Sequence, residues 1–126
     1  MNAILAVMLG GALGALARFG VQTTVPLFTA TAFPLATMLV NIVGSFLMGI
    51  GVVFFWQNPE ISQSLKLFLL TGFLGAFTTF SAFSLDVSVL MTSNNYVQIA
   101  IYILGTVCLS IAALLAAIAL TKAVLA

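Results

Sequence analysis

Charged residues are almost absent from this chain, and that feature leaves few folds open to it. Five of its 126 residues carry a charge, and they stand far apart: Arg18, Glu60, Lys66, Asp86 and Lys122. A soluble domain carries charge on about a quarter of its residues, whereas 63% of this chain is hydrophobic. We therefore expect an integral membrane protein. Its backbone must be helical or form a closed barrel, and long apolar runs without alternation exclude the barrel.

Four segments are long enough to cross a bilayer, which takes about 20 residues each. They run from about Ala3 to Gln22, from Pro34 to Trp56, from Ser64 to Met91 and from Tyr96 to Lys122. Short polar or proline-containing connections separate them, at Thr23–Phe33, Gln57–Gln63 and Thr92–Asn95. We predict one all-α transmembrane domain over residues 1–126, with both termini on the same side of the membrane.

Several kinds of site and partner are excluded by what the chain lacks. It has no histidine and a single cysteine, Cys108, so neither a transition-metal site nor an intrachain disulfide is expected. A net charge of +1 indicates no nucleic-acid partner. No basic residue precedes the first apolar stretch, so a cleaved signal peptide is not expected.

Four short helices enclose little space, so we expect a homodimer or a higher oligomer. Gly10 and Gly14 form a GxxxG spacing, and Ser45 and Gly49 repeat it with small residues. Such residues let helices approach closely in lipid. The sequence leaves open whether these faces pack within one chain or between two chains.

Few charges are available to orient the chain in the membrane. Lys66 and Lys122, offset by Glu60, lie on the side of the termini, and Arg18 lies on the other side, near the end of the first helix. Two basic residues against one make a weak positive-inside signal. Insertion in both orientations with antiparallel pairing, and a single orientation set by the lysines, both stay open.

The third segment gathers polar residues inside an apolar run. Hydroxyls alternate with phenylalanines there, in Gly75-Ala76-Phe77-Thr78-Thr79-Phe80-Ser81-Ala82-Phe83-Ser84. Lipid offers a hydroxyl no water partner, so such a cluster lines a polar path or lies between helices. Phenyl rings have a positive edge, and the run has no carboxylate, so the path suits a small anion. Phenylalanines at helical spacing are also ordinary core residues, but the interleaved hydroxyls favour a pore.

Glycines weaken the same segment just before its paired threonines. Gly72 and Gly75 disfavour a helix, and Thr78 and Thr79 carry hydroxyls that can satisfy freed backbone groups. A break in the helix is therefore tolerable in lipid. It would free carbonyl oxygens, which could bind a hard cation such as Na⁺.

Three further polar residues in the spans each have two or more interpretations. Asn41, about two turns after Pro34, can donate to an anion or link two helices. Arg18 can draw anions into a vestibule or extend to the lipid headgroups. Asp86 could relay protons, bind a cation or lie in a watery vestibule, which we favour because Met91 and the helix end are close.

The fourth segment carries a polar stripe. Tyr102, Thr106 and Ser110 recur at i, i+4 and i+8, which places three hydroxyls on one helix face. We expect this face to meet a polar path or another helix rather than lipid.

Together these segments resemble the Fluc family of fluoride channels, also called CrcB. The matching runs cover most of the chain: Gly10–Phe19, Leu39–Phe46, Gly72–Ser84 and the stripe in the fourth segment. The resemblance implies a fluoride-selective channel, not an enzyme, that passively exports cytoplasmic fluoride across a prokaryotic plasma (inner) membrane and confers fluoride resistance. It also implies an antiparallel, dual-topology homodimer in the lipid bilayer, with a broken third helix in each subunit.

The resemblance extends to individual residues. Phe80 and Phe83 match the family's phenylalanine box, Asn41 its pore asparagine and Arg18 its vestibule arginine. The full set of anion-binding or pore positions that it implies is Arg18, Asn41, Thr79, Phe80, Ser81, Phe83, Ser84, Tyr102, Thr106 and Ser110. Backbone carbonyls of Gly75 and Thr78 match those that hold a central structural Na⁺.

The chain departs from the family pattern at three alanines. Ala82 stands where a threonine is common, so one hydroxyl is missing from the third segment. Ala36 and Ala76 stand where glycines are common, which concerns backbone packing alone.

Two other functions fit a chain with four spans. A small multidrug transporter depends on a membrane-embedded glutamate in its first helix, and the first helix here contains no acid. A non-transporting accessory subunit is the second alternative. Ion flux through the purified protein in liposomes separates it from both transport functions.

Overall fold

The structure, a computed structural model, describes residues 2–29 and 31–125. Its helices are α1 (Ala3–Phe28), α2 (Leu35–Gln57), α3 (Gln63–Lys66), the π-helix η1 (Leu67–Leu74), α4 (Gly75–Phe77), α5 (Phe80–Met91) and α6 (Tyr96–Leu125). Four helical stretches are long and apolar enough to span a bilayer: Ala3–Phe28, Leu35–Gln57, Gln63–Met91 and Tyr96–Leu125. The prediction of an all-helical, multi-pass membrane protein is confirmed.

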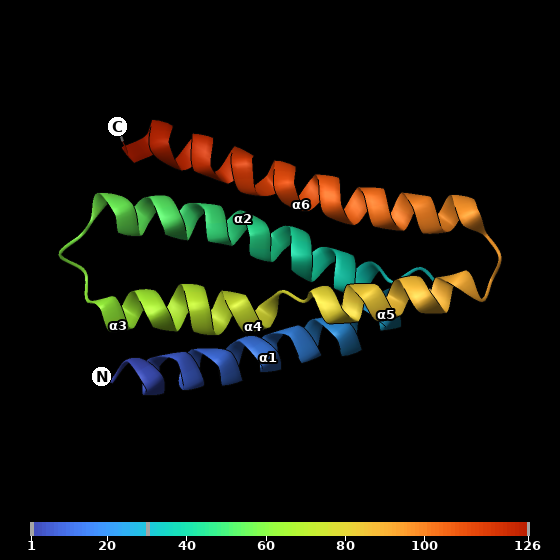
Figure 1. Cartoon of the computed structure of the whole chain (residues 1–126), viewed down its shortest axis with the longest axis horizontal. Helices are drawn as coiled ribbons and strands as arrows, with labels where there is room; N and C mark the ends of the chain where they lie inside the picture. The colour runs from blue at the N-terminus through green and yellow to red at the C-terminus, as the bar shows by residue number, and fades with distance from the viewer. Residues whose placement is uncertain (1, 30, 126) are drawn as a thin grey trace.

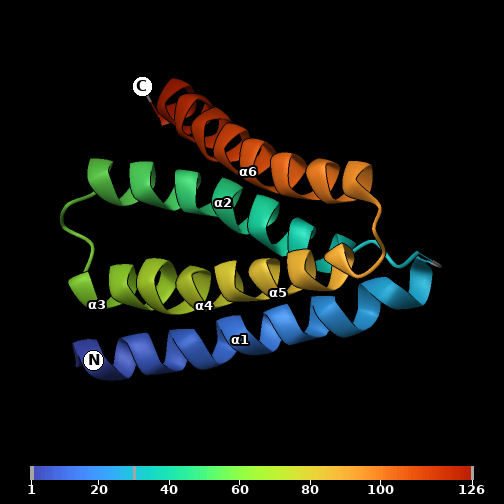
Figure 2. The ribbon, with the colours of Figure 1, turned by 45° about the vertical axis from the view of Figure 1, so that its right-hand side comes forward.

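The four spans lie side by side along the long axis of the molecule (Figure 1). In both views α2 lies between α6 and the third span, and α1 covers the far side of the third span (Figure 2). Both ends of the chain lie at one end of the molecule, together with the connection from α2 to α3 (Figure 1). This is the arrangement expected of an even number of spans.

The first helix is longer than the sequence predicts. The expected connection at Thr23–Phe33 is wrong for its first half, because α1 continues to Phe28 with Pro26 inside it. The hydroxyl of Thr23 donates to the Phe19 carbonyl at 2.9 Å and so stays within the helix rather than opening it. Position 30 of that connection lies outside the described residues. The last helix likewise passes its predicted end and continues to Leu125, the last described residue.

The third span changes its hydrogen bonding twice along its length. Eight residues, Leu67–Leu74, form the π-helix η1, and the amide of Gly75 reaches back five residues to the Leu70 carbonyl. After α4, Thr78 (φ −76°, ψ 156°) and Thr79 (φ −153°, ψ 123°) have extended backbones, and α5 begins at Phe80. π-Helical turns occur often at functional sites. The extended pair places non-helical backbone within a candidate membrane span.

Glycines bring α1 into backbone contact with η1. A Cβ on Gly10 would lie 2.1 Å from the Phe68 carbonyl oxygen, and one on Gly14 would lie 2.1 Å from the Phe73 carbonyl oxygen. Both glycines of the GxxxG spacing are therefore used within one chain. The same holds for Gly49, whose Cβ would lie 2.6 Å from the Leu114 carbonyl oxygen of α6. Of the two interpretations left open, packing within the chain is confirmed.

Candidate functional site

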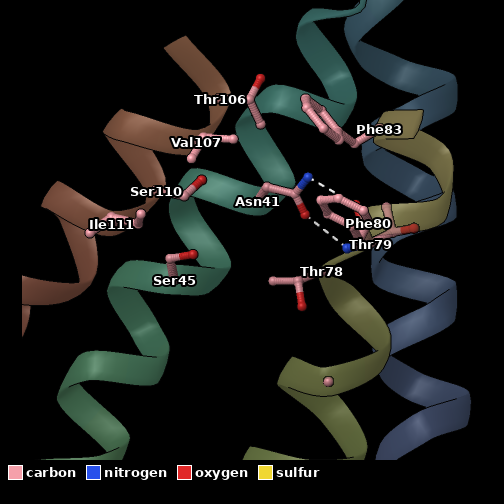
Figure 3. Close-up of a pocket in the computed structure, with 11 residues that line it drawn as sticks. Asn41, Ser45, Thr78, Thr79, Phe80, Phe83, Thr106, Val107, Ser110 and Ile111 are labelled. Carbon is pink, nitrogen blue, oxygen red and sulfur yellow. Dashed lines mark hydrogen bonds between the residues drawn. The ribbon is translucent and has the colours of Figure 1, made fainter. Parts of the chain in front are cut away.

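A groove of about 430 Å³ opens beside the extended pair of threonines (Figure 3). Three spans line it, with Asn41, Ser45, Gly75, Thr78, Thr79, Phe80, Phe83, Thr106, Val107, Ser110 and Ile111. Most of the predicted site residues thus meet in one place, although they come from segments far apart in the chain.

Asn41 of α2 is bound to the backbone of the third span. Its Oδ1 accepts from the Thr79 amide at 2.8 Å, and its Nδ2 donates to the Thr79 carbonyl at 3.0 Å (Figure 3). The side chain therefore satisfies both backbone groups of a residue that lies outside any helix. Of the two interpretations of Asn41, the linking of two helices is confirmed, and one N–H of its amide stays available to the groove.

The hydroxyl of Thr79 caps the helix that follows. It accepts from the Ala82 amide at 3.1 Å and lies 3.2 Å from the Ser81 hydroxyl oxygen. This is the N-cap interaction that starts an α-helix. The first turn of α5 therefore begins beside the groove with its amides directed back toward Thr79.

Extended backbone at the paired threonines also releases a carbonyl. In a continuous helix the amide of Thr79 would bond to the carbonyl of Gly75, four residues before it. Here that amide bonds to Asn41 instead. The Gly75 carbonyl loses its helical partner, and both Gly75 and Thr78 line the groove.

The two phenylalanines of the site differ sharply in exposure. Phe80 is 76% exposed, whereas Phe83 is 7% exposed. Their ring centroids lie 5.4 Å apart, and Phe83 also lies 5.4 Å from the ring of Tyr102. Phe83 is thus held by its neighbours, while Phe80 projects from the surface of the single chain.

Two hydroxyls of α6 reach the groove without a protein partner. The Oγ1 of Thr106 and the Oγ of Ser110 are buried, and neither forms a hydrogen bond with any described residue. Buried hydroxyls are nearly always paired, since an unpaired one costs roughly 1–3 kcal/mol. Donors left in this state point to a ligand that accepts hydrogen bonds.

The third member of the α6 stripe lies outside the groove. Tyr102 is fully buried, and its hydroxyl donates to Asp86 Oδ2 at 2.9 Å. Its ring meets Phe33 edge-on, with centroids 5.5 Å apart. All three residues of the predicted face, Tyr102, Thr106 and Ser110, are buried or half-buried. The hydroxyl of Tyr102, however, is bound to the Asp86 carboxylate and is not directed into the groove.

Arg18 lines a separate cavity on the other side of the extended pair. This cavity of about 370 Å³ also contains Gln22, Thr79, Ser81, Ala82 and Leu85. Thr79 belongs to both cavities, so it separates the arginine from the groove. The predicted position of Arg18 near the end of its helix is wrong, because α1 runs on to Phe28.

Ser84, like Tyr102, lies apart from both cavities, and one polar residue that lines the groove, Ser45, was not predicted as part of the site. The Ser84 hydroxyl donates to the Phe80 carbonyl at 3.0 Å and is exposed. Ser45 lines the groove one turn after Asn41. The sequence offered a signal for Ser45, since a polar residue four positions after Asn41 shares its helix face, but its small size favoured a packing role.

Comparison with known proteins gives one consistent result. The family model described as "CrcB-like protein, Camphor Resistance (CrcB)" matches residues 5–118. The chain is similar to a "Fluoride-specific ion channel FluC" from Rhodopseudomonas palustris (strain BisB5), at 44% identity over 95% of this chain and 97% of the relative. Proteins of the same description from Saccharophagus degradans (47% identity, 94% and 88% covered) and Rhizobium meliloti (42% identity, 98% and 98% covered) are also similar.

Proposed function

We propose that this chain, which belongs to the CrcB-like family, is the subunit of a fluoride-specific ion channel. Fluoride would leave the cytoplasm passively through the groove. The relatives described as fluoride channels cover nearly the whole chain, and no described segment is left over for another activity. The observation on this chain that carries the proposal is the pair of buried, unpartnered hydroxyls of Thr106 and Ser110 beside Phe80 and Phe83.

The groove chemistry suits a small anion that must shed water. Hydroxyl donors can replace hydration hydrogen bonds, and ring edges add a weak positive potential without a formal charge. The residues that line the groove include no carboxylate and no ammonium group. An anion would thus be held by several weak donors, which permits both entry and release.

Arg18 would supply long-range attraction to this path. Its cavity meets the groove at Thr79, whose hydroxyl oxygen lies 3.2 Å from that of Ser81, a lining residue of the Arg18 cavity. A fixed positive charge at the mouth of a path raises the local concentration of anions. We propose that anions collect near Arg18 and pass Thr79 into the groove.

We propose further that two copies of the chain pair in antiparallel orientation over the groove. A polar groove on the outer surface of one chain would face lipid, which cannot satisfy its donors. Phe80, 76% exposed at the groove, offers a large ring to a partner. The weak charge bias of the connections is compatible with insertion in both orientations.

A structural Na⁺ fits the same part of the molecule. Carbonyls of Gly75 and Thr78 would hold it, since neutral carbonyl oxygens suit a hard cation and the Gly75 carbonyl has lost its helical partner. When bound, the ion would supply positive charge near the anion path. The side chain of Thr78 donates to the Leu74 carbonyl at 3.0 Å, so its role there is local.

Flux through the purified protein in liposomes tests the proposal. Vesicles loaded with potassium fluoride should release fluoride, read by an electrode, and vesicles loaded with potassium chloride should hold their chloride. Equal efflux of the two anions would contradict selectivity, and no efflux of either would favour an accessory subunit. Uptake of a lipophilic cation would favour the multidrug alternative.

A further inference from the structure

The wall that α2 contributes to the groove offers two polar side chains, and they differ in what they are bound to. Asn41 has both of its amide atoms engaged with Thr79. Ser45, one turn later on the same face, forms no hydrogen bond with any residue in the described part of the chain. The hydroxyl of Ser45 is therefore wholly uncommitted, whereas Asn41 keeps one free N–H for the groove.

The state of Ser45 is unusual for a hydroxyl on a membrane helix. Such residues commonly donate to the carbonyl one turn before them, which satisfies them without any ligand. Thr23, Thr78 and Ser84 do this here, at 2.9, 3.0 and 3.0 Å. Of the groove hydroxyls that do not, Thr79 caps α5, and those of Ser45, Thr106 and Ser110 have no hydrogen bond with any described residue.

Packing holds Ser45 in place at the groove. The preceding residue, Gly44, meets the extended pair so closely that a Cβ there would lie 2.3 Å from Thr78 Cγ2 and 3.1 Å from Phe77 Cδ1. The backbone of α2 is thus fixed against the third span at this point. Ser45 then faces the groove with Ser110 on the neighbouring helix and Thr78 across from it (Figure 3).

We infer that Ser45 is an anion ligand and a determinant of selectivity for fluoride. The inference rests on the proposed channel function and deepens it. Ser45 from α2, with Thr106 and Ser110 from α6, offers three hydroxyl donors from two helices to one ion. Fluoride is a small, strong hydrogen-bond acceptor. Each hydroxyl donor therefore stabilises a dehydrated fluoride ion by more free energy than it stabilises a dehydrated chloride ion. Loss of one donor therefore lowers fluoride passage more than chloride passage.

Substitution at Ser45 tests this with flux in liposomes. Ser45→Ala should lower fluoride efflux by about tenfold, the equivalent of one hydrogen bond in the rate, while chloride efflux should stay at the background level of the parent protein. Ser45→Thr keeps the hydroxyl and should stay within about threefold of the parent protein, since the added methyl changes packing but not the donor. Ser88→Ala removes an exposed hydroxyl of α5 outside the groove and should match the parent.

Two other outcomes would overturn the inference. Parent-like fluoride efflux by Ser45→Ala means that the hydroxyl touches no ion, while the channel proposal still stands if the parent conducts. A packing role would instead lower the fluoride efflux of Ser45→Ala and of Ser45→Thr by a similar factor. If Ser45→Ala does not fold, Ser45→Cys carries the same test, because a thiol of similar size is a weaker donor. A parent protein that passes no fluoride refutes the channel proposal itself.

Discussion

Asn41 and Thr79 are joined by two hydrogen bonds of opposite direction, at 2.8 and 3.0 Å, between one side chain and both backbone groups of the other residue. This pair connects α2 to the one point of the third span where two consecutive residues have extended backbones. The geometry of the groove depends on it, because Thr79 also caps α5 and lies between the Arg18 cavity and the groove.

Asn41→Ala should destabilise the protein and abolish fluoride flux. It leaves the Thr79 amide and carbonyl without partners in a buried position, which costs roughly 1–3 kcal/mol. Denaturation in detergent measures the free energy of unfolding, and liposome efflux measures the flux. Thr23→Ala also removes a side-chain bond to a carbonyl, but on an exposed part of α1, and should change stability by less than about 0.5 kcal/mol. Equal free energies of unfolding for the two variants would show that the Asn41 hydrogen bonds do not stabilise the fold.

Thr106→Val should separate stability from function. The substitution keeps the side-chain shape and removes a buried hydroxyl that has no partner among the described residues. The free energy of unfolding should rise by about 1 kcal/mol, whereas fluoride efflux should fall. A decrease in both would mean that the hydroxyl is bonded within the folded protein and is not a ligand.

Phe80→Ile and Phe83→Ile should both impair fluoride efflux, because isoleucine stays hydrophobic but lacks a positive ring edge. Their effects on stability should differ. Phe83 is 7% exposed and packs on Tyr102, so its replacement should cost on the order of 1–2 kcal/mol. Replacement of the exposed Phe80 should cost little in the single chain. If both variants release fluoride as fast as the parent protein, the two rings serve packing and do not contact the ion.

Gly10→Ala and Gly11→Ala form a matched pair that tests the contact of α1 with η1. The new Cβ at Gly10 would lie 2.1 Å from the Phe68 carbonyl oxygen, so the helices must separate. At Gly11 a Cβ meets nothing within 4 Å, and alanine should stabilise the helix by up to about 1 kcal/mol. We expect a loss of folded protein by size-exclusion chromatography for the first variant alone. Similar yields would mean that α1 packs elsewhere.

Cysteine labelling in intact cells should find the chain in both orientations. Asn95→Cys, in a Cys108→Ala background, places a thiol in the exposed connection between α5 and α6. Gln57→Cys places one at the opposite end, where α2 ends. A membrane-impermeant reagent should label a fraction of each, because two basic residues against one fix topology weakly. Labelling confined to one of the two positions would establish a single orientation.

The spans were predictable because hydrophobicity adds up along a segment. All four predicted starts lie within one residue of the observed starts, which are Ala3, Leu35, Gln63 and Tyr96. The end of α1 was not predictable, since Thr23 and Pro26 are residues that usually occur in connections. In this helix the Thr23 hydroxyl bonds to a carbonyl of its own helix. The π-helix η1 was not predictable either, because its sequence has no hydrophobic periodicity that distinguishes it from an α-helix.

Composition and spacing alone determined that this chain is helical, lies in a membrane and gathers hydroxyls and phenyl rings in its third and fourth spans, because these are properties of residues one or two turns apart. Only the tertiary structure decided which donors are free. Asn41 meets a residue 38 positions away and Tyr102 one 16 positions away, and no local pattern encodes such distant pairs. Thr106, Ser110 and Ser45 look equally polar in the sequence, yet they meet no partner in the described chain. Free donors arise where packed helices leave a hydroxyl beside a groove, and packing depends on the whole fold.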